Sequence, residues 1–118
     1  MENAKESKDI GELLIHLGIN RTYVGYHYIV YGISRASGDP NLVTNILKGL
    51  YVEIASHFHT STECVERNIR TAIHTIWSYG DRKLLNAVFG STLKERPCNG
   101  EFIRALLCYV ENKDMVRK

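Results

Sequence analysis

Long apolar runs are missing from this sequence. No stretch of its 118 residues approaches the roughly eighteen consecutive apolar residues that a membrane-spanning helix needs. The N-terminus, MENAKESKDIGE, also lacks the apolar core of a secretory signal. We therefore expect a cytoplasmic protein that makes no membrane contact, and we expect its polar segment 1–9 to be flexible.

Cysteine is scarce, and metal-binding motifs are absent. The three cysteines, Cys64, Cys98 and Cys108, are odd in number and share no metal-binding spacing, which favours reduced thiols. We interpret Cys64 as a partly buried small residue in preference to a redox-sensitive thiol. His57 and His59 do not direct two imidazoles at one ion, and no HExxH motif includes them or His74. We expect no metal site and no cofactor.

Catalytic motifs are absent as well. The chain has no glycine-rich phosphate loop, no GxSxG elbow and no acid–base pair that its spacing identifies, so we do not expect an enzyme. Net charge is only +2, but segment 81–118 holds eight basic and five acidic side chains. This mildly basic third of the chain suits phosphate contacts, and it equally suits an ordinary solvated surface.

The alternation of apolar and polar residues that marks β-strands is also missing, and helical periodicity indicates an all-α domain. Pro40 is placed to begin a helix, and Pro97 keeps 91–98 a loop. Glycines and capping residues predict the other boundaries. Gly18 and Gly90 are expected to end helices, and Asp81 and Asn99 are expected to cap them. Gly49 is expected to separate two helices: one that carries Leu42, Val43, Ile46 and Leu47, and one at 50–58.

The segment from Ile54 to Trp77 contains two helices joined by a tight turn. Thr60 and Glu63 have the spacing of a capping box that starts the second helix. That helix has an apolar face of Val65, Ile69, Ala72, Ile73, Ile76 and Trp77, and an opposite face of Glu63, Arg67, Arg70 and His74. A short helix, a turn and a longer helix with arginines outside form the helix-turn-helix plan, which predicts binding to duplex DNA.

Several ordered motifs carry a resemblance to a known family. They are His16-Leu17-Gly18-Ile19, Gly25-Tyr26-His27-Tyr28, Val65-Glu66-Arg67 with Ile69-Arg70, Ala72-Ile73, Trp77-Ser78-Tyr79-Gly80, Phe89-Gly90 and Asn99-Gly100-Glu101-Phe102-Ile103. From about Ile10 to Ile103 the chain resembles the C-terminal DNA-binding effector domain of the stage-zero sporulation response regulator, a bacterial transcription factor.

This resemblance implies a six-helix, bundle-like all-α domain. Its recognition helix, 61–79, would enter the major groove at boxes of the TGTCGAA type. Two domains would often bind adjacent boxes, which would make a homodimer on DNA. Segment 80–93 would contact an RNA polymerase sigma subunit.

The chain departs from the family pattern in two respects. The family has a receiver domain before the effector domain, whereas only residues 1–9 precede the match here, so we expect the domain at 10–118 to lack that control. Cys64 stands where the family has a base-reading arginine, Glu63 replaces a small polar residue, and Thr71 replaces a histidine. A thiol cannot make the bidentate guanine contact of arginine, which is worth roughly 1–3 kcal/mol. We expect an altered or relaxed site preference.

The candidate DNA contacts lie on this helix and just before it. Arg67 suits guanine and Glu66 suits cytosine N4, but i,i+4 pairs of Glu63 with Arg67 and of Glu66 with Arg70 are the structural alternative. Hydroxyls near the helix start suit phosphate oxygens. The predicted DNA-binding residues are Thr60, Ser61, Thr62, Cys64, Glu66, Arg67, Arg70, Thr71 and His74. The predicted phosphate contacts are Lys94, Arg96, Lys113, Arg117 and Lys118.

A second hypothesis keeps the helical fold without specific DNA binding. Glu63 and Cys64 both weaken the recognition face, and a domain of this size would then act as a protein-interaction module on a related regulator. Binding to short DNA duplexes distinguishes the two hypotheses.

Overall fold

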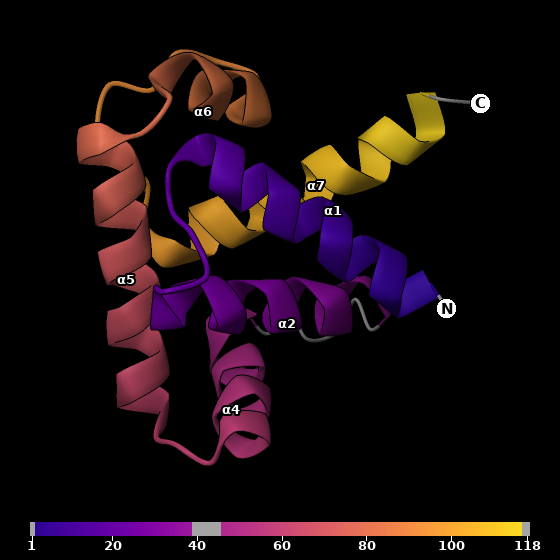
Figure 1. Cartoon of the computed structure of the whole chain (residues 1–118), viewed down its shortest axis with the longest axis vertical. Helices are drawn as coiled ribbons and strands as arrows, with labels where there is room; N and C mark the ends of the chain where they lie inside the picture. The colour runs from indigo at the N-terminus through magenta and orange to yellow at the C-terminus, as the bar shows by residue number, and fades with distance from the viewer. Residues whose placement is uncertain (1, 39–45, 117–118) are drawn as a thin grey trace.

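The computed structural model describes the backbone of residues 2–38 and 46–116 and the side chains of residues 9–37 and 48–111. Over these residues the regular structure is entirely helical, which confirms the all-α prediction (Figure 1). The helices are α1 (Glu2–Leu17), α2 (Val24–Gly38), α4 (Ile46–Phe58), α5 (Thr62–Tyr79), α6 (Arg82–Phe89) and α7 (Asn99–Val116). No helix in the described ranges is long and apolar enough to cross a bilayer.

The helix α5 occupies one side of the molecule and packs against α2, α4 and α7. In Figure 1, α4 lies beside the beginning of α5 and α6 lies beyond its end. The predicted apolar face of α5 is buried at Val65, Ile69, Ala72, Ile73 and Ile76. Trp77, predicted on the same face, is half-buried at the edge of the core, and the Arg82 guanidinium lies 3.4 Å from its ring centroid.

The contact between α2 and α5 depends on Gly25. A β-carbon at this position would lie 2.3 Å from the Asn68 carbonyl oxygen, so a larger residue would push the helices apart. This close approach places Tyr28, one turn further along α2, beneath the start of α5. The helix α2 therefore covers the side of α5 that bears Cys64 and Asn68.

Several predicted boundaries are confirmed. Gly18 (φ 132°) and Gly90 (φ 75°) lie in the left-handed region just after α1 and α6, as expected for glycines that end helices. The Asp81 carboxylate caps α6 by accepting a hydrogen bond from the Leu84 amide at 3.0 Å. The segment 91–98, which contains Pro97, is a loop.

Three other boundaries differ from the prediction. The spacing of Ile10, Leu13, Leu14 and Leu17 predicts a short helix that starts near Ile10, but α1 begins at Glu2, because the residues before Ile10 include good helix formers. The flexibility of 1–9 stays a prediction. Gly49 lies inside α4, since one glycine costs a helix only about 1 kcal/mol. Asn99 is the first residue of α7 and not its cap, because the Cys98 amide before it donates to the Glu101 carboxylate at 3.0 Å. The predictions for Pro40, Leu42 and Val43 lie outside the described residues.

Candidate nucleic-acid interface

The turn between α4 and α5 begins at His59. This residue has φ 57°, a left-handed conformation that is uncommon without glycine. The Thr60 amide donates to the Ala55 carbonyl at 2.9 Å, and the His59 amide donates to the Ser56 carbonyl at 3.4 Å. These two bonds form a Schellman motif, which ends α4 and redirects the chain. The helices α4 and α5 thus form the predicted helix-turn-helix pair (Figure 1).

Ser61 caps α5. Its backbone is extended, with φ −96° and ψ 158°, and its Oγ accepts a hydrogen bond from the Cys64 amide at 3.1 Å. The capping box predicted for Thr60 and Glu63 is wrong, because Thr60 still belongs to the Schellman turn and the first extended residue is Ser61. Glu63 stays exposed in the first turn, where a carboxylate interacts favourably with the helix dipole.

An exposed polar stripe runs along α5, and we call it the outer stripe. It consists of Glu63, Arg67, Arg70, Thr71 and His74, which recur at helical spacing on the side away from the core. Four predicted DNA-binding residues, Arg67, Arg70, Thr71 and His74, therefore share one surface. Ser61 is exposed just before the helix, and Thr60, Thr62 and Glu66 are half-buried beside the stripe.

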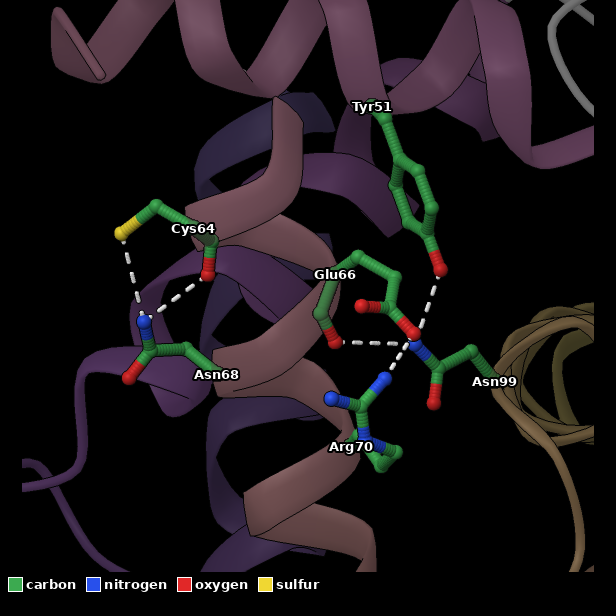
Figure 2. Close-up of polar contacts among 6 residues, drawn as sticks. All are labelled: Tyr51, Cys64, Glu66, Asn68, Arg70 and Asn99. Atoms are coloured by element: carbon green, nitrogen blue, oxygen red, sulfur yellow. Dashed lines mark hydrogen bonds and ion pairs between the residues drawn. The ribbon is translucent and has the colours of Figure 1, made fainter. Parts of the chain in front are cut away.

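The two arginines of the outer stripe differ in their partners. The Arg70 guanidinium pairs with the Glu66 carboxylate one turn earlier, so this i,i+4 pair forms as the structural alternative expects (Figure 2). Arg67 makes no ion pair with any described residue, and the alternative pair with Glu63 does not form. Arg67 therefore presents an exposed guanidinium, the group whose planar fork suits a guanine edge or a phosphate.

Cys64 lies outside the outer stripe and is half-buried. Its sulfur is 3.8 Å from the Tyr28 hydroxyl. Nδ2 of Asn68 lies 3.3 Å from the same sulfur and also donates to the Cys64 carbonyl at 2.8 Å (Figure 2). Hydrogen bonds from Thr60 and then Tyr28 lower the pKa of the Cys64 thiol, and the Arg67 charge acts in the same direction. The thiol faces α2 and Asn68, so a DNA contact by Cys64 stays a prediction.

A basic loop flanks the outer stripe. Nη1 of Arg96 donates a hydrogen bond to Nδ1 of His74 at 3.1 Å, which requires the imidazole nitrogen to be unprotonated. Beside this pair, a groove of about 400 Å³ opens between α4, α5 and the start of α7, with Tyr51, Arg70 and Asn99 in its lining. The fold thus brings Arg96, a predicted phosphate contact, next to the recognition helix.

The remaining predicted phosphate contacts are placed less fully. Lys94 is exposed in the same loop as Arg96. Lys113 belongs to the last turns of α7, and its side chain lies outside the described residues. Arg117 and Lys118 also lie outside them.

Sequence reasoning misses the side chains that hold α5 from outside the outer stripe. Nδ2 of Asn99 donates to the Tyr51 hydroxyl at 2.8 Å and to the Glu66 carbonyl at 3.1 Å (Figure 2). Burial raises the pKa of the Tyr51 phenol. The sequence contains one indication of the role of Asn99. Cys98 and Glu101 have the spacing of a capping box, with cysteine in place of the usual serine or threonine. If Cys98 and Glu101 close the start of the helix, the Asn99 side chain is not needed as its cap.

The comparison with known families gives a match over most of the chain. The model described as "Sporulation initiation factor Spo0A C terminal" matches residues 10–110, which include the helix-turn-helix pair, the outer stripe, α6 and the start of α7. This confirms the resemblance drawn from the sequence. The family is one of DNA-binding regulatory domains and not a family of enzymes. The chain belongs to the family of Spo0A C-terminal domains, the DNA-binding effector domains of sporulation initiation factors.

Proposed function

We propose that the chain is a sequence-specific transcription regulator that inserts α5 into the major groove of DNA. The observation that carries the proposal is the exposed guanidinium of Arg67 in the middle of the outer stripe, which makes no ion pair with any residue that the structure describes. Arg70, Thr71 and His74 continue the same surface along the helix. An arginine opposite guanine and polar neighbours on the same face are the means by which recognition helices read the major groove.

The preferred DNA site differs from the TGTCGAA-type box of the family. Cys64 occupies the position of the family's base-reading arginine, and its sulfur forms hydrogen bonds with the Tyr28 hydroxyl and the Asn68 side-chain amide. Glu66 and Arg70 pair with each other in the free protein, so reading bases with either one requires that this exposed pair opens. An exposed pair of this kind contributes only about 0.3–0.5 kcal/mol, which a DNA contact readily replaces.

Phosphate contacts at both ends of the reading surface would set its position on the duplex. Ser61 and its neighbours Thr60 and Thr62 lie at the start of α5, where the helix dipole favours an anion. Arg96 and Lys94 supply positive charge from the flanking loop. We propose Lys113, Arg117 and Lys118 as further phosphate contacts because each is positively charged.

Binding to short duplexes tests this function. The protein is titrated against a duplex with the family box, a scrambled duplex and a randomised pool, each at two salt concentrations. We expect selection of a defined site from the pool, with an affinity that falls as salt rises because bound counterions are released. Failure to bind any duplex at low salt would overturn the proposal.

Family membership also suggests two protein contacts. Two domains would bind adjacent boxes as a homodimer on DNA, and the segment 80–93 would contact an RNA polymerase sigma subunit. Arg82 and Lys83 of α6 are exposed in this segment and offer positive charge to such a partner. Cooperative binding to a two-box duplex and cross-linking from Lys83 to a purified sigma subunit would test these contacts.

The second candidate function is a protein-interaction module acting on a related regulator. The exposed carboxylate of Glu63 favours it, because this charge stands at the end of α5 that would approach DNA phosphates. A protein that binds no duplex but weakens DNA binding by a related full-length regulator would support this reading.

A further inference from the structure

One amide joins the recognition helix to two other helices. Asn99, the first residue of α7, donates from Nδ2 both to the Tyr51 hydroxyl of α4 and to the Glu66 carbonyl of α5, at 2.8 and 3.1 Å. Only 8% of the Asn99 surface is exposed. A buried amide held by two acceptors has a defined orientation, and truncating it would remove the Asn99 donor from the Tyr51 hydroxyl and leave the Glu66 carbonyl with its helical hydrogen bond alone.

The Asn99 amide is available for this role because another residue closes the start of α7. The Cys98 amide donates to the Glu101 carboxylate, so the helix end does not need the Asn99 side chain. The Glu66 carbonyl has a second lone pair beyond the one used within the helix, and it accepts the Asn99 hydrogen bond there. The contact therefore adds to the helical hydrogen bonds without replacing one.

The contact occurs at the residue that also carries a candidate base-reading group. The Glu66 carbonyl accepts from Asn99, while the Glu66 carboxylate pairs with Arg70 (Figure 2). On the other side of α5, Gly25 and Tyr28 of α2 meet Asn68 and Cys64. The helix is thus held from two sides at the turn that presents Glu66, Arg67 and Arg70 to the outside.

We infer that Asn99, anchored by Tyr51, is a positioning residue that sets the specificity of DNA reading by fixing how α5 projects from the domain. The inference rests on the proposed DNA-binding function. Bidentate contacts to base edges tolerate little displacement of the guanidinium, whereas phosphate contacts through long side chains adapt to a shifted helix. Loss of the anchor would therefore reduce discrimination between sequences more than it reduces general affinity for DNA.

The test uses Tyr51→Phe and a matched control, Tyr31→Phe. Both changes remove one hydroxyl from a half-buried tyrosine, but the Tyr31 hydroxyl donates to the Glu53 carboxylate at 2.9 Å, a bond between α2 and α4 that does not involve α5. For each variant, dissociation constants are measured for the best duplex selected from a randomised pool and for a scrambled duplex. The specificity ratio is the dissociation constant for the scrambled duplex divided by the dissociation constant for the best duplex. Thermal unfolding shows whether each variant is folded.

We expect Tyr51→Phe to lower the specificity ratio roughly 3- to 10-fold, the range of one lost hydrogen bond, with little change in affinity for the scrambled duplex. Asn99→Ala should lower the ratio at least as much, and the double variant should fall no further than Asn99→Ala, because the two residues act as one unit. Tyr31→Phe should leave the ratio unchanged.

Two results with Tyr51→Phe would overturn the inference. An equal loss of affinity for both duplexes in Tyr51→Phe would mean that the anchor has only a general structural role, and an unchanged ratio in folded Tyr51→Phe would mean that it has none in reading. A wild-type protein that discriminates between no duplexes would refute the proposed function and this inference together. Wild-type discrimination with unchanged variant ratios would refute the inference alone.

Discussion

Arg96 donates a hydrogen bond to Nδ1 of His74 across 3.1 Å, which ties the loop before α7 to the outer stripe of α5. The two residues are 22 positions apart in the chain, and the contact forms because the loop after α6 returns alongside the recognition helix. A guanidinium beside the reading surface is well placed for the phosphates that border a major groove.

Replacing Arg96 with alanine should weaken binding to specific and scrambled duplexes by the same factor. The reason is that a phosphate contact carries no sequence information. Loss of the contact should also reduce the slope of log affinity against log salt concentration by about 1. Arg104→Ala is the control, because it removes an equal exposed charge from α7 in a groove bordered by α6 and not by α5. A selective loss for the specific duplex would mean that Arg96 reads bases.

Arg67→Ala should reduce discrimination at one position of the site. A good bidentate contact is worth roughly 1–3 kcal/mol against the wrong base, and Arg67 has no described ion-pair partner that would compete for its guanidinium. The measurement is competition with duplexes changed at one base pair at a time. If Arg67→Ala lowers the affinity for the unchanged duplex and for every single-base variant by the same factor, Arg67 contacts phosphate and its assignment as a base reader is wrong.

Cys64→Arg should restore preference for the family box. The new guanidinium cannot remain between Tyr28 and Asn68 without desolvation, so its long side chain should extend toward the exposed start of α5. Cys64→Ser is the control, since a hydroxyl can keep the hydrogen bonds to Tyr28 and Asn68 and adds no base contact. Unchanged box preference in a folded Cys64→Arg protein would show that this position is not equivalent to the family's arginine.

Ser61→Ala should lower the free energy of unfolding by about 1 kcal/mol, because it removes the acceptor for the Cys64 amide at the start of α5. Denaturant unfolding measures the change. Ser78→Ala serves as the matched control, since Ser78 is exposed in the last turn of the same helix and is not the cap. A loss of similar size in both variants would contradict the assignment of Ser61 as the cap.

Alkylation of Cys64 should reach half its maximal rate at a lower pH than that of a cysteine in an unfolded peptide. Hydrogen bonds from Thr60 and Tyr28 favour the thiolate and lower the pKa of Cys64. By linkage, the contribution of this group to stability is fully present above its unfolded pKa and is lost as pH falls through the lower folded value. Iodoacetamide kinetics on a Cys98→Ser, Cys108→Ser protein measures the pKa, and adding Tyr28→Phe should move the midpoint to higher pH. A midpoint that does not move would exclude the Tyr28 contribution.

Local patterns predicted the parts of the fold that depend on neighbours in the chain. The buried face of α5 followed from the spacing of Val65, Ile69, Ala72, Ile73 and Ile76, because a helix places such positions on one side. Gly18, Gly90 and Asp81 were also predicted correctly, since each acts on backbone groups within a few residues. The predicted cap of α5, Thr60, was wrong by one residue. Thr60 belongs to the turn that ends α4, and this turn decides where the next helix can begin.

The sequence by itself determined the all-α class, the helix-turn-helix, the family and the outer stripe with Arg67 at its centre. Only the tertiary structure decided that the Cys64 thiol faces Tyr28, that Arg96 meets His74, and that Asn99 joins Tyr51 to Glu66. The physical reason is the range of the interactions. Periodicity and capping act within a few residues, whereas these contacts join residues 22 to 48 positions apart and form only when the helices pack.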